Sequence, residues 1–223
     1  RDQITSLEIH FQMVILLISF VKSALGVRKS TPNEIVLIEC GFLPLEALIY
    51  SRQLRFYQKF KEVLQPQSSR HVLFRELLET CPPYLQHYVD LEGKYNSKEE
   101  TFTEYLNKMK AVIRQKASSG SHYKYNMYLL VNPTLVPSVF INDMNSISWK
   151  ITKFRVGGHY LPIETGRWSR KLRHERLCPS CGTLGDEAHI LFSCSDVDRS
   201  GLILPNSIAD VWESPYILEL FRR

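Results

Sequence analysis

Three cysteines and one histidine lie close together near the carboxy-terminal end of the sequence. Cys178 and Cys181 are separated by two residues, His189 follows after seven more, and Cys194 after a further four. Thiolates and imidazoles are ligands that zinc prefers, and four of them form a closed tetrahedral site. The spacing therefore predicts one zinc ion with a structural role, because four protein ligands leave no position for a catalytic water.

Each half of this motif makes a demand on the local chain. Gly182 follows the second cysteine and supplies the positive φ that a tight turn around two thiolates needs. Residues 186–194 read as a short helix, on which His189 and Cys194 would point about 140° apart. We therefore expect the helix to end or distort before Cys194. The alternative is that the first two cysteines only form a turn, that His189 lies on a helix surface and that Cys194 is a buried thiol.

A basic run precedes the metal motif. This basic strip, residues 150–176, contains eight lysines and arginines against two glutamates. Cations can hold phosphates, and an aromatic ring within the run can stack on an unpaired base. The residues predicted to contact a nucleic acid are Arg155, Arg167, Trp168, Arg170, Lys171, Arg173 and Arg176. The alternative is a solvated basic loop that Trp168 anchors to the core.

The composition is that of a globular protein, with 44% hydrophobic and 23% charged residues and a formal net charge of +5. Only five cysteines occur, three of them in the metal motif, which argues against a disulfide scaffold and for a reducing compartment. We expect an intracellular protein, in the nucleus, the cytoplasm or both. The chain opens with Arg1, and we expect it to be part of something longer. The apolar run at residues 11–21 is shorter than the about 20 residues that span a bilayer, so no membrane partner is predicted.

Motifs of known catalytic sites are missing from the sequence. It has no Walker loop and no G-x-G-x-x-G, G-x-S-x-G or H-E-x-x-H pattern. No two aspartates are adjacent, so the carboxylate pair with which polymerases hold two metals is not recognisable. We therefore predict no catalytic residue in this chain.

Helix signals recur along the chain and predict a mainly α-helical protein, an irregular multi-helix domain with a small zinc-knuckle module near its end. The first helix, residues 4–25, is strongly apolar, and we expect it to be mostly buried. Capping boxes at residues 31–34 and 97–100 open two others, and Asn142 or Asp143 is predicted to cap a helix ending at Arg155. The remaining predicted helices are 44–64, 71–80, 84–92, 186–194, 207–212 and 214–221.

Three parts follow from these signals and from the Ser-Ser-Gly-Ser break at residues 118–121. Residues 1–117 are predicted to form a helical domain, and residues 118–149 a connecting segment with a short helix. Residues 150–223 hold the basic strip, the zinc module and two closing helices.

Two stretches of the sequence resemble one family. Residues 25–33, 39–45 and 52–57 are similar to the segment that follows the polymerase core in reverse transcriptases of non-LTR retrotransposons. Residues 154–168 and 176–194 resemble the carboxy-terminal CCHC region of the same elements, whereas residues 64–144 have no match. The resemblance puts Cys178, Cys181, His189 and Cys194 at the ligand positions and implies that the basic region contacts template RNA or target DNA.

The expected function is therefore that of a nucleic-acid-binding accessory region. The polymerase fingers, the palm with its catalytic aspartates and any endonuclease motif are absent, so the chain is either the tail of such an element or a host protein derived from one. Its expected partners are RNA or DNA, and an upstream polymerase domain or another protein through the apolar first helix. One alternative is a domesticated protein-interaction subunit without a nucleic-acid role. Another is an enzyme that uses zinc catalytically, which requires an open coordination position.

Overall fold

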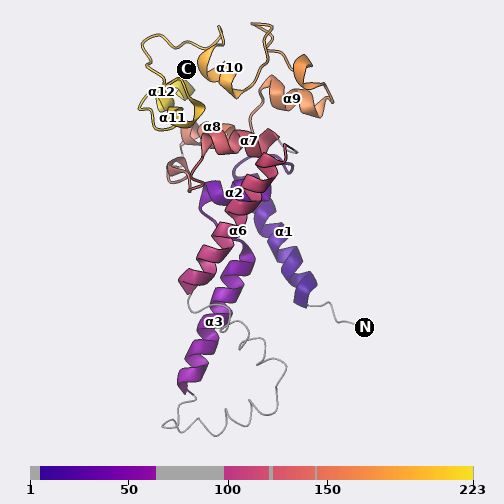
Figure 1. Cartoon of the computed structure of the whole chain (residues 1–223), viewed down its shortest axis with the longest axis vertical. Helices are drawn as coiled ribbons and strands as arrows, with labels where there is room; N and C mark the ends of the chain where they lie inside the picture. The colour runs from indigo at the N-terminus through magenta and orange to yellow at the C-terminus, as the bar shows by residue number, and fades with distance from the viewer. Residues whose placement is uncertain (1–5, 64–97, 121–122, 144, 223) are drawn as a thin grey trace. The chain divides into compact units, whose positions relative to one another are not determined.

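The computed structural model describes residues 6–63, 98–120, 123–143 and 145–222 (Figure 1). Over these ranges the protein is mainly α-helical, as predicted, and its one β element is an isolated antiparallel bridge between Leu177 and Leu184. None of the described helices is long and apolar enough to cross a membrane. The elements are α1 (Ser6–Ala24), α2 (Asn33–Cys40), α3 (Leu45–Val63), α6 (Lys98–Ser118), α7 (Tyr123–Val131), η1 (Val139–Ile141), α8 (Ser146–Arg155), α9 (Pro162–Trp168), η2 (Arg173–Glu175), α10 (Glu187–Phe192), α11 (Ile208–Val211) and α12 (Ile217–Arg222).

Contacts within the chain divide it into two compact units. The first combines Arg1–Phe42 with Lys110–Arg223, and the second is Leu43–Met109. The metal motif and the basic strip both belong to the first unit. The three parts predicted from composition and loop signals, with boundaries after residues 117 and 149, stay a prediction. The predicted helices at 71–80 and 84–92 lie outside the described residues.

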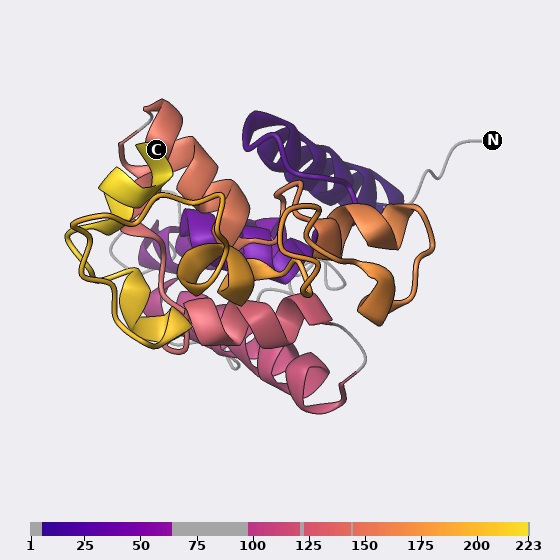
Figure 2. The same ribbon diagram turned by 90° about the horizontal axis from the view of Figure 1, so that it is seen from above.

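Helix α2 lies in the middle of the first unit in both ribbon views (Figure 1, Figure 2). Ile35, Val36 and Glu39 have no exposed surface, which is why the short helix can carry apolar residues on every side. The helix stops at Gly41, whose φ is +68°, a conformation that glycine adopts readily and that commonly ends helices.

The predicted capping box at the start of α2 is wrong. Pro32 occupies the N-cap position and no side chain caps the helix, while the Thr31 hydroxyl is buried without a partner. The Glu34 carboxylate turns instead to two partners, Lys116 Nζ at 3.1 Å and the Tyr125 hydroxyl at 3.0 Å. These contacts hold α2 against α6 and α7, so tertiary partners outcompete the local cap.

Five helices of the first unit share one hydrophobic core. They are α7, α8, α10, α11 and α12, and Figure 2 shows the last of these on the same side as α8. The core residues are Met127, Val131, Ile151, Phe154, Leu191, Val211, Trp212, Ile217 and Leu220. Leu191 belongs to α10, the helix that also carries His189. The metal motif is therefore joined to the helical body through its own helix.

Helix α8 ends as predicted but begins later. Its N-cap is Asn145, whose side chain accepts hydrogen bonds from the backbone N–H groups of Ile147 and Ser148, so Asn142 and Asp143 are not the cap. The last residue is Arg155, and Gly157 follows with a φ of +64°.

The next glycine, Gly158, is required for a different reason, namely close packing. A Cβ at this position would lie 2.8 Å from Val27 Cγ1 and 3.3 Å from the Lys153 carbonyl oxygen. We expect Gly158→Ala to lower the free energy of unfolding by about 1–3 kcal/mol, as overpacking does. Combining it with Val27→Ala, which removes the clashing methyl, should cost less than the two single changes summed. Additive losses in urea denaturation would contradict this packing.

Helix α1 differs from its prediction. Met13, Leu16 and Phe20 are 48%, 66% and 71% exposed, and burial begins only at Val21. The predicted mostly buried helix is therefore wrong over its described side chains. The reason is that α1 meets α2 through its carboxy-terminal end, where Val21 and Leu25 pack. The preceding turns present an apolar surface without a partner among the described residues.

The second unit also corrects a predicted face. The helical spacing of Leu48 and Phe56 in α3 predicts that both point inward, but they are 38% and 61% exposed, whereas Leu54 is buried. Tyr50 packs against Leu54, and its ring stacks on Tyr105 of α6 with centroids 6.1 Å apart. The buried face is thus rotated toward Tyr50 and Leu54.

Candidate metal centre

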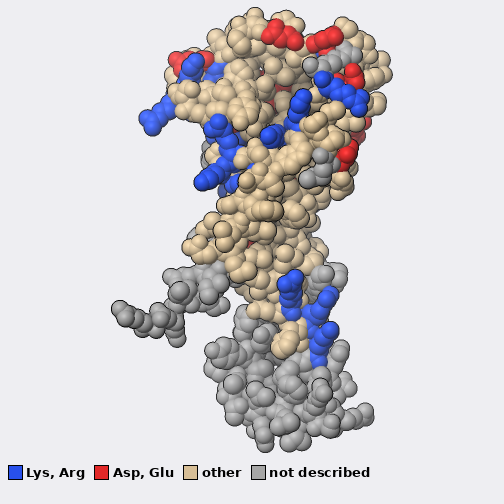
Figure 3. Space-filling view, turned by 180° about the vertical axis from the view of Figure 1, so that it is seen from behind, with Lys and Arg blue, Asp and Glu red and all other residues tan. Residues whose placement is uncertain are grey.

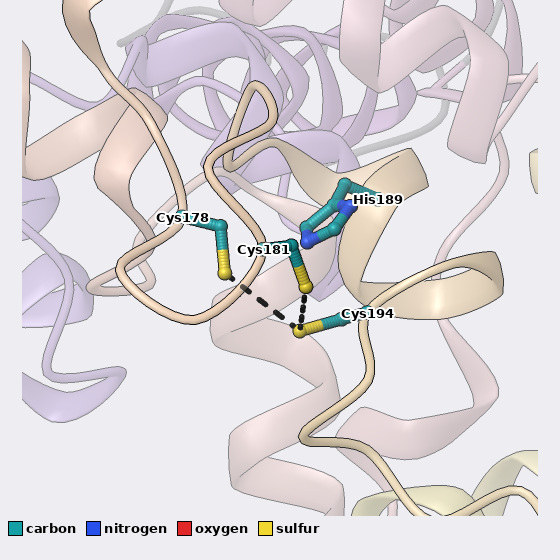
Figure 4. A group of neighbouring side chains, drawn as sticks. All are labelled: Cys178, Cys181, His189 and Cys194. Atoms are coloured by element: carbon teal, nitrogen blue, oxygen red, sulfur yellow. Dashed lines mark hydrogen bonds between the residues drawn. The ribbon is translucent and has the colours of Figure 1, made fainter.

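The four predicted ligands converge on one point. One ligand atom from each of Cys178, Cys181, His189 and Cys194 lies within 4.8 Å of all the others. Figure 4 shows the three sulfur atoms and the imidazole turned toward one another, with the first two cysteines on a loop and the histidine on α10. Cys178, His189 and Cys194 are buried and Cys181 is half-buried. The cluster could therefore hold one metal ion.

A tight turn brings the first two cysteines together. The Cys178 N–H donates to the Thr183 carbonyl at 2.7 Å, and the Gly182 N–H donates to the Cys178 carbonyl at 2.9 Å. Gly182 has a φ of +67°, which confirms its predicted role, because other residues rarely adopt this conformation.

Helix α10 ends where the metal site requires it. Asp186 caps the helix by accepting a 3.0 Å hydrogen bond from the His189 N–H, and the last helical residue is Phe192. The Cys194 N–H then bonds to the His189 carbonyl at 2.8 Å. This turn brings residues five apart to the same side, and the predicted interruption before Cys194 is confirmed.

The His189 ring is oriented for metal binding. Its Nδ1 lies 3.1 Å from the Thr183 hydroxyl, whereas its Nε2 is buried and has no hydrogen-bond partner. With Nδ1–H donating to Thr183, the lone pair of Nε2 faces the cluster, the arrangement that fixes the tautomer of metal-bound histidines. An unpartnered buried nitrogen is unfavourable, and a metal ion would satisfy it. The residues present therefore fit a metal.

The sulfur geometry also fits. Cys194 Sγ lies 3.8 Å from the Sγ atoms of both Cys178 and Cys181, far beyond the about 2.05 Å of a disulfide. A tetrahedron with zinc–sulfur bonds of about 2.3 Å has edges of about 3.8 Å. In addition, the Ser195 hydroxyl and backbone N–H approach Cys181 Sγ at 3.2 and 3.4 Å. These hydrogen bonds from Ser195 lower the pKa of the Cys181 thiol and favour the thiolate.

Three residues that support the metal cluster could not be identified from the sequence alone. Thr183 orients the histidine and Ser195 donates to Cys181. Arg199 donates to the carbonyls of Leu191 and Cys194, both at 2.7 Å, and so closes the chain after the last ligand. The first two adjoin the motif and could be sought there, but no pattern identifies Arg199.

Buried polar contacts position the segment between α8 and the metal motif. Lys124 Nζ lies 3.0 Å from the Glu164 carboxylate and donates to the Gly157 carbonyl at 2.7 Å. His159 Nε2 lies 2.9 Å from Glu187 Oε1 at the start of α10. These contacts tie α9 and the turn after α8 to α7 and α10.

Arg155 does not belong to the predicted nucleic-acid surface. Its side chain is buried and donates to both carboxylate oxygens of Glu39, at 2.5 and 3.2 Å. Its guanidinium also lies 5.2 Å from the Trp212 ring centroid. Reaching a phosphate would break this pair and leave Glu39 uncompensated, so we remove Arg155 from the predicted contacts.

The other predicted contacts fall into two groups. Arg170, Lys171 and Arg173 are exposed. Arg167 and Arg176 are half-buried and already engaged, Arg167 with the Glu164 carboxylate at 2.9 Å and Arg176 with backbone carbonyls.

Trp168 is half-buried in α9, a helix that no sequence signal above predicts. The helix starts with Pro162 and contains Gly166, where a Cβ would overlap the Arg176 side chain. The Trp168 ring lies under the Arg28 guanidinium and edge-on to Tyr160.

Comparisons with family models, curated proteins and solved structures find no match to the chain.

Proposed function

We propose that this chain is a nucleic-acid-binding accessory region of a retrotransposon-type reverse transcriptase. In this proposal Cys178, Cys181, His189 and Cys194 form a CCHC knuckle around one structural zinc ion. The ion supplies a fixed tetrahedral crosslink, and exposed cations on the chain leading into it neutralise phosphates. Four protein ligands would fill the zinc coordination shell, which argues against a catalytic zinc.

The observation that carries the proposal is the arrangement of charge beside the metal cluster. Arg170, Lys171 and Arg173 are exposed on the segment between α9 and Cys178. Arg173 is the most constrained of them, with its guanidinium 4.5 Å from the Tyr123 ring centroid and 3.7 Å from Asp186 Oδ2. A crosslink at Cys178 would hold these cations on a short, fixed segment.

Contacts between the two resembling stretches also support the proposal. Glu39 of the first stretch pairs with Arg155 of the second, and Val27 packs against Gly158. The two stretches lie more than a hundred residues apart in the sequence, yet they contact each other within the first unit. Such contact is expected if both stretches descend from one retrotransposon-type reverse transcriptase.

Salt-dependent binding tests the nucleic-acid role. We expect fluorescence anisotropy to show an affinity for polynucleotides that falls with salt, and three contacts to a single strand should contribute about −2 to the log–log slope. Changing Arg170, Lys171 and Arg173 together to glutamine should remove this contribution. The matched control changes Arg52, Arg55 and Lys59, three exposed cations of α3, to glutamine. Wild-type protein without salt-sensitive affinity would refute the proposal.

The exposed apolar side chains of α1 favour a second candidate, a protein-interaction role. Leu16 and Phe20 are 66% and 71% exposed on a 19-residue helix. Partner assembly that survives the triple change at Arg170, Lys171 and Arg173, together with an absence of polynucleotide binding, would support this candidate.

A further inference from the structure

The loop between α1 and α2 brings two more cations to the predicted basic strip. The exposed Arg28 places its guanidinium over the Trp168 ring, although the two residues are 140 positions apart. Its exposed neighbour Lys29 is fixed through its backbone, because the Lys22 ammonium donates to the Lys29 carbonyl at 2.8 Å and to Asn33 Oδ1 at 2.6 Å. The loop is therefore held in place beside α9.

An exposed aromatic ring lies at the same place. Tyr160 is 73% exposed, and its ring meets Trp168 edge-on with centroids 5.7 Å apart and an interplanar angle of 88°. Trp168 thus contacts Tyr160 and Arg28 together. An exposed tyrosine supported by a half-buried tryptophan is a ready platform for stacking.

Arg170 has an unusual backbone for an arginine. Its φ is +57°, a conformation that favours glycine. It follows the end of α9, where the Arg170 N–H bonds to the Arg167 carbonyl and the Lys171 N–H to the Gly166 carbonyl. This pattern is a Schellman ending, whose left-handed position is usually occupied by glycine. An arginine at that position suggests a role for its side chain that backbone preference does not explain.

These residues define a basic-aromatic surface consisting of Arg28, Lys29, Tyr160, Trp168, Arg170 and Lys171. Figure 3 shows lysine and arginine side chains gathered on one face of the first unit, with the acidic side chains of this view toward its edges. We propose that the surface binds a single-stranded polynucleotide, with Tyr160 stacking on an unpaired base and the four cations contacting phosphates. This rests on the proposed function and narrows it to single strands.

The preference for a single strand follows from the aromatic ring. The base faces of a duplex are stacked on one another, so an exposed tyrosine can stack only where a base is unpaired. Stacking tolerates any base, whereas recognition of a duplex sequence needs side chains in a groove. The surface should therefore show little sequence preference.

Anisotropy titrations with labelled single-stranded RNA, single-stranded DNA and duplex DNA of one sequence test the inference. We expect the single strands to bind at least tenfold more tightly than the duplex, and the RNA and DNA arms to identify which strand is preferred. Tyr160→Leu should weaken single-strand binding at least about fivefold, and Tyr160→Phe should retain it. Arg28→Gln with Lys29→Gln should lower the salt slope by about 1.4. The control is Arg114→Gln, an exposed cation of α6, which contributes nothing to the surface.

Arg170→Gly separates binding from folding. It should weaken binding several-fold without lowering the melting temperature, because glycine accepts the positive φ more readily than arginine. Equal or tighter duplex binding, or unchanged single-strand affinity in Tyr160→Leu, would overturn this inference while leaving the proposed function intact. Absence of salt-sensitive binding to all three probes would overturn both.

Discussion

Cys181→Ser is expected to abolish stoichiometric zinc. The purified wild-type chain should carry one zinc ion, and the variant should lose it to a competing chelator, because a serine hydroxyl is a poor replacement for the thiolate. A serine hydroxyl at this position can still meet the Ser195 N–H and hydroxyl that now contact Cys181 Sγ, so any local destabilisation should come from loss of the metal. Metal analysis by mass spectrometry measures the outcome.

The effect on stability should be large and local. Structural zinc sites in small peptides bind with about 10–16 kcal/mol, and this energy becomes folding energy where no core replaces it. Between Cys178 and Cys194 only the short helix α10 contributes to the main core, through the buried Leu191 and the partly buried Ile190 and Phe192. Hydrogen exchange should therefore rise first in residues 177–195, and less in α7 and α8.

Cys40→Ser provides the matched control, because Cys40 is half-buried in α2 and lies outside the cluster. Burial, with the nearby Glu39 charge, raises the pKa of its thiol to about 12, so it stays protonated and is a poor metal ligand. The control should keep one zinc per chain. Full zinc retention in Cys181→Ser after the chelator would mean that the ligands are wrongly assigned.

The metal cluster could be predicted because its information is local. All four ligands lie within 17 residues, and turn chemistry at Gly182 and helix geometry before Cys194 are properties of short segments. The same holds for the stops at Gly41 and Gly157, where positive φ follows from glycine itself.

What escaped prediction depends on distant partners. Glu34 accepts hydrogen bonds from α6 and α7 instead of capping its own helix, and no local sequence pattern indicates this pairing. The local excess of lysine and arginine likewise led to the prediction that Arg155 lies on the surface. An excess of cations in the sequence does not show which of them pairs with a buried carboxylate. The exposed side chains of α1 show the converse, because apolarity alone does not decide whether a helix is covered within its own chain.

Glu39→Gln is expected to destabilise the first unit more than neutralising any of its exposed cations. Glu39 is fully buried and accepts hydrogen bonds from Arg155 and, at 3.0 Å, from the Tyr128 hydroxyl. The glutamine would leave the Arg155 cation buried without a counter-charge, a loss of about 3–5 kcal/mol. Urea denaturation followed by circular dichroism measures the change.

Two comparisons make this expectation specific. Glu219→Gln breaks the exposed pair with Arg222 and should cost about 0–1 kcal/mol, since surface pairs contribute little. Glu39→Leu combined with Arg155→Met removes both charges and should be less destabilising than Glu39→Gln, because no buried ion is left alone. If Glu39→Gln lowered the free energy of unfolding no more than Glu219→Gln, the Glu39–Arg155 pair would not be what holds together the two stretches that resemble the reverse transcriptase family. A large loss that the double change relieves would mean that Arg155 serves the fold, and the proposed polynucleotide binding would then rest on the exposed cations beside the metal cluster.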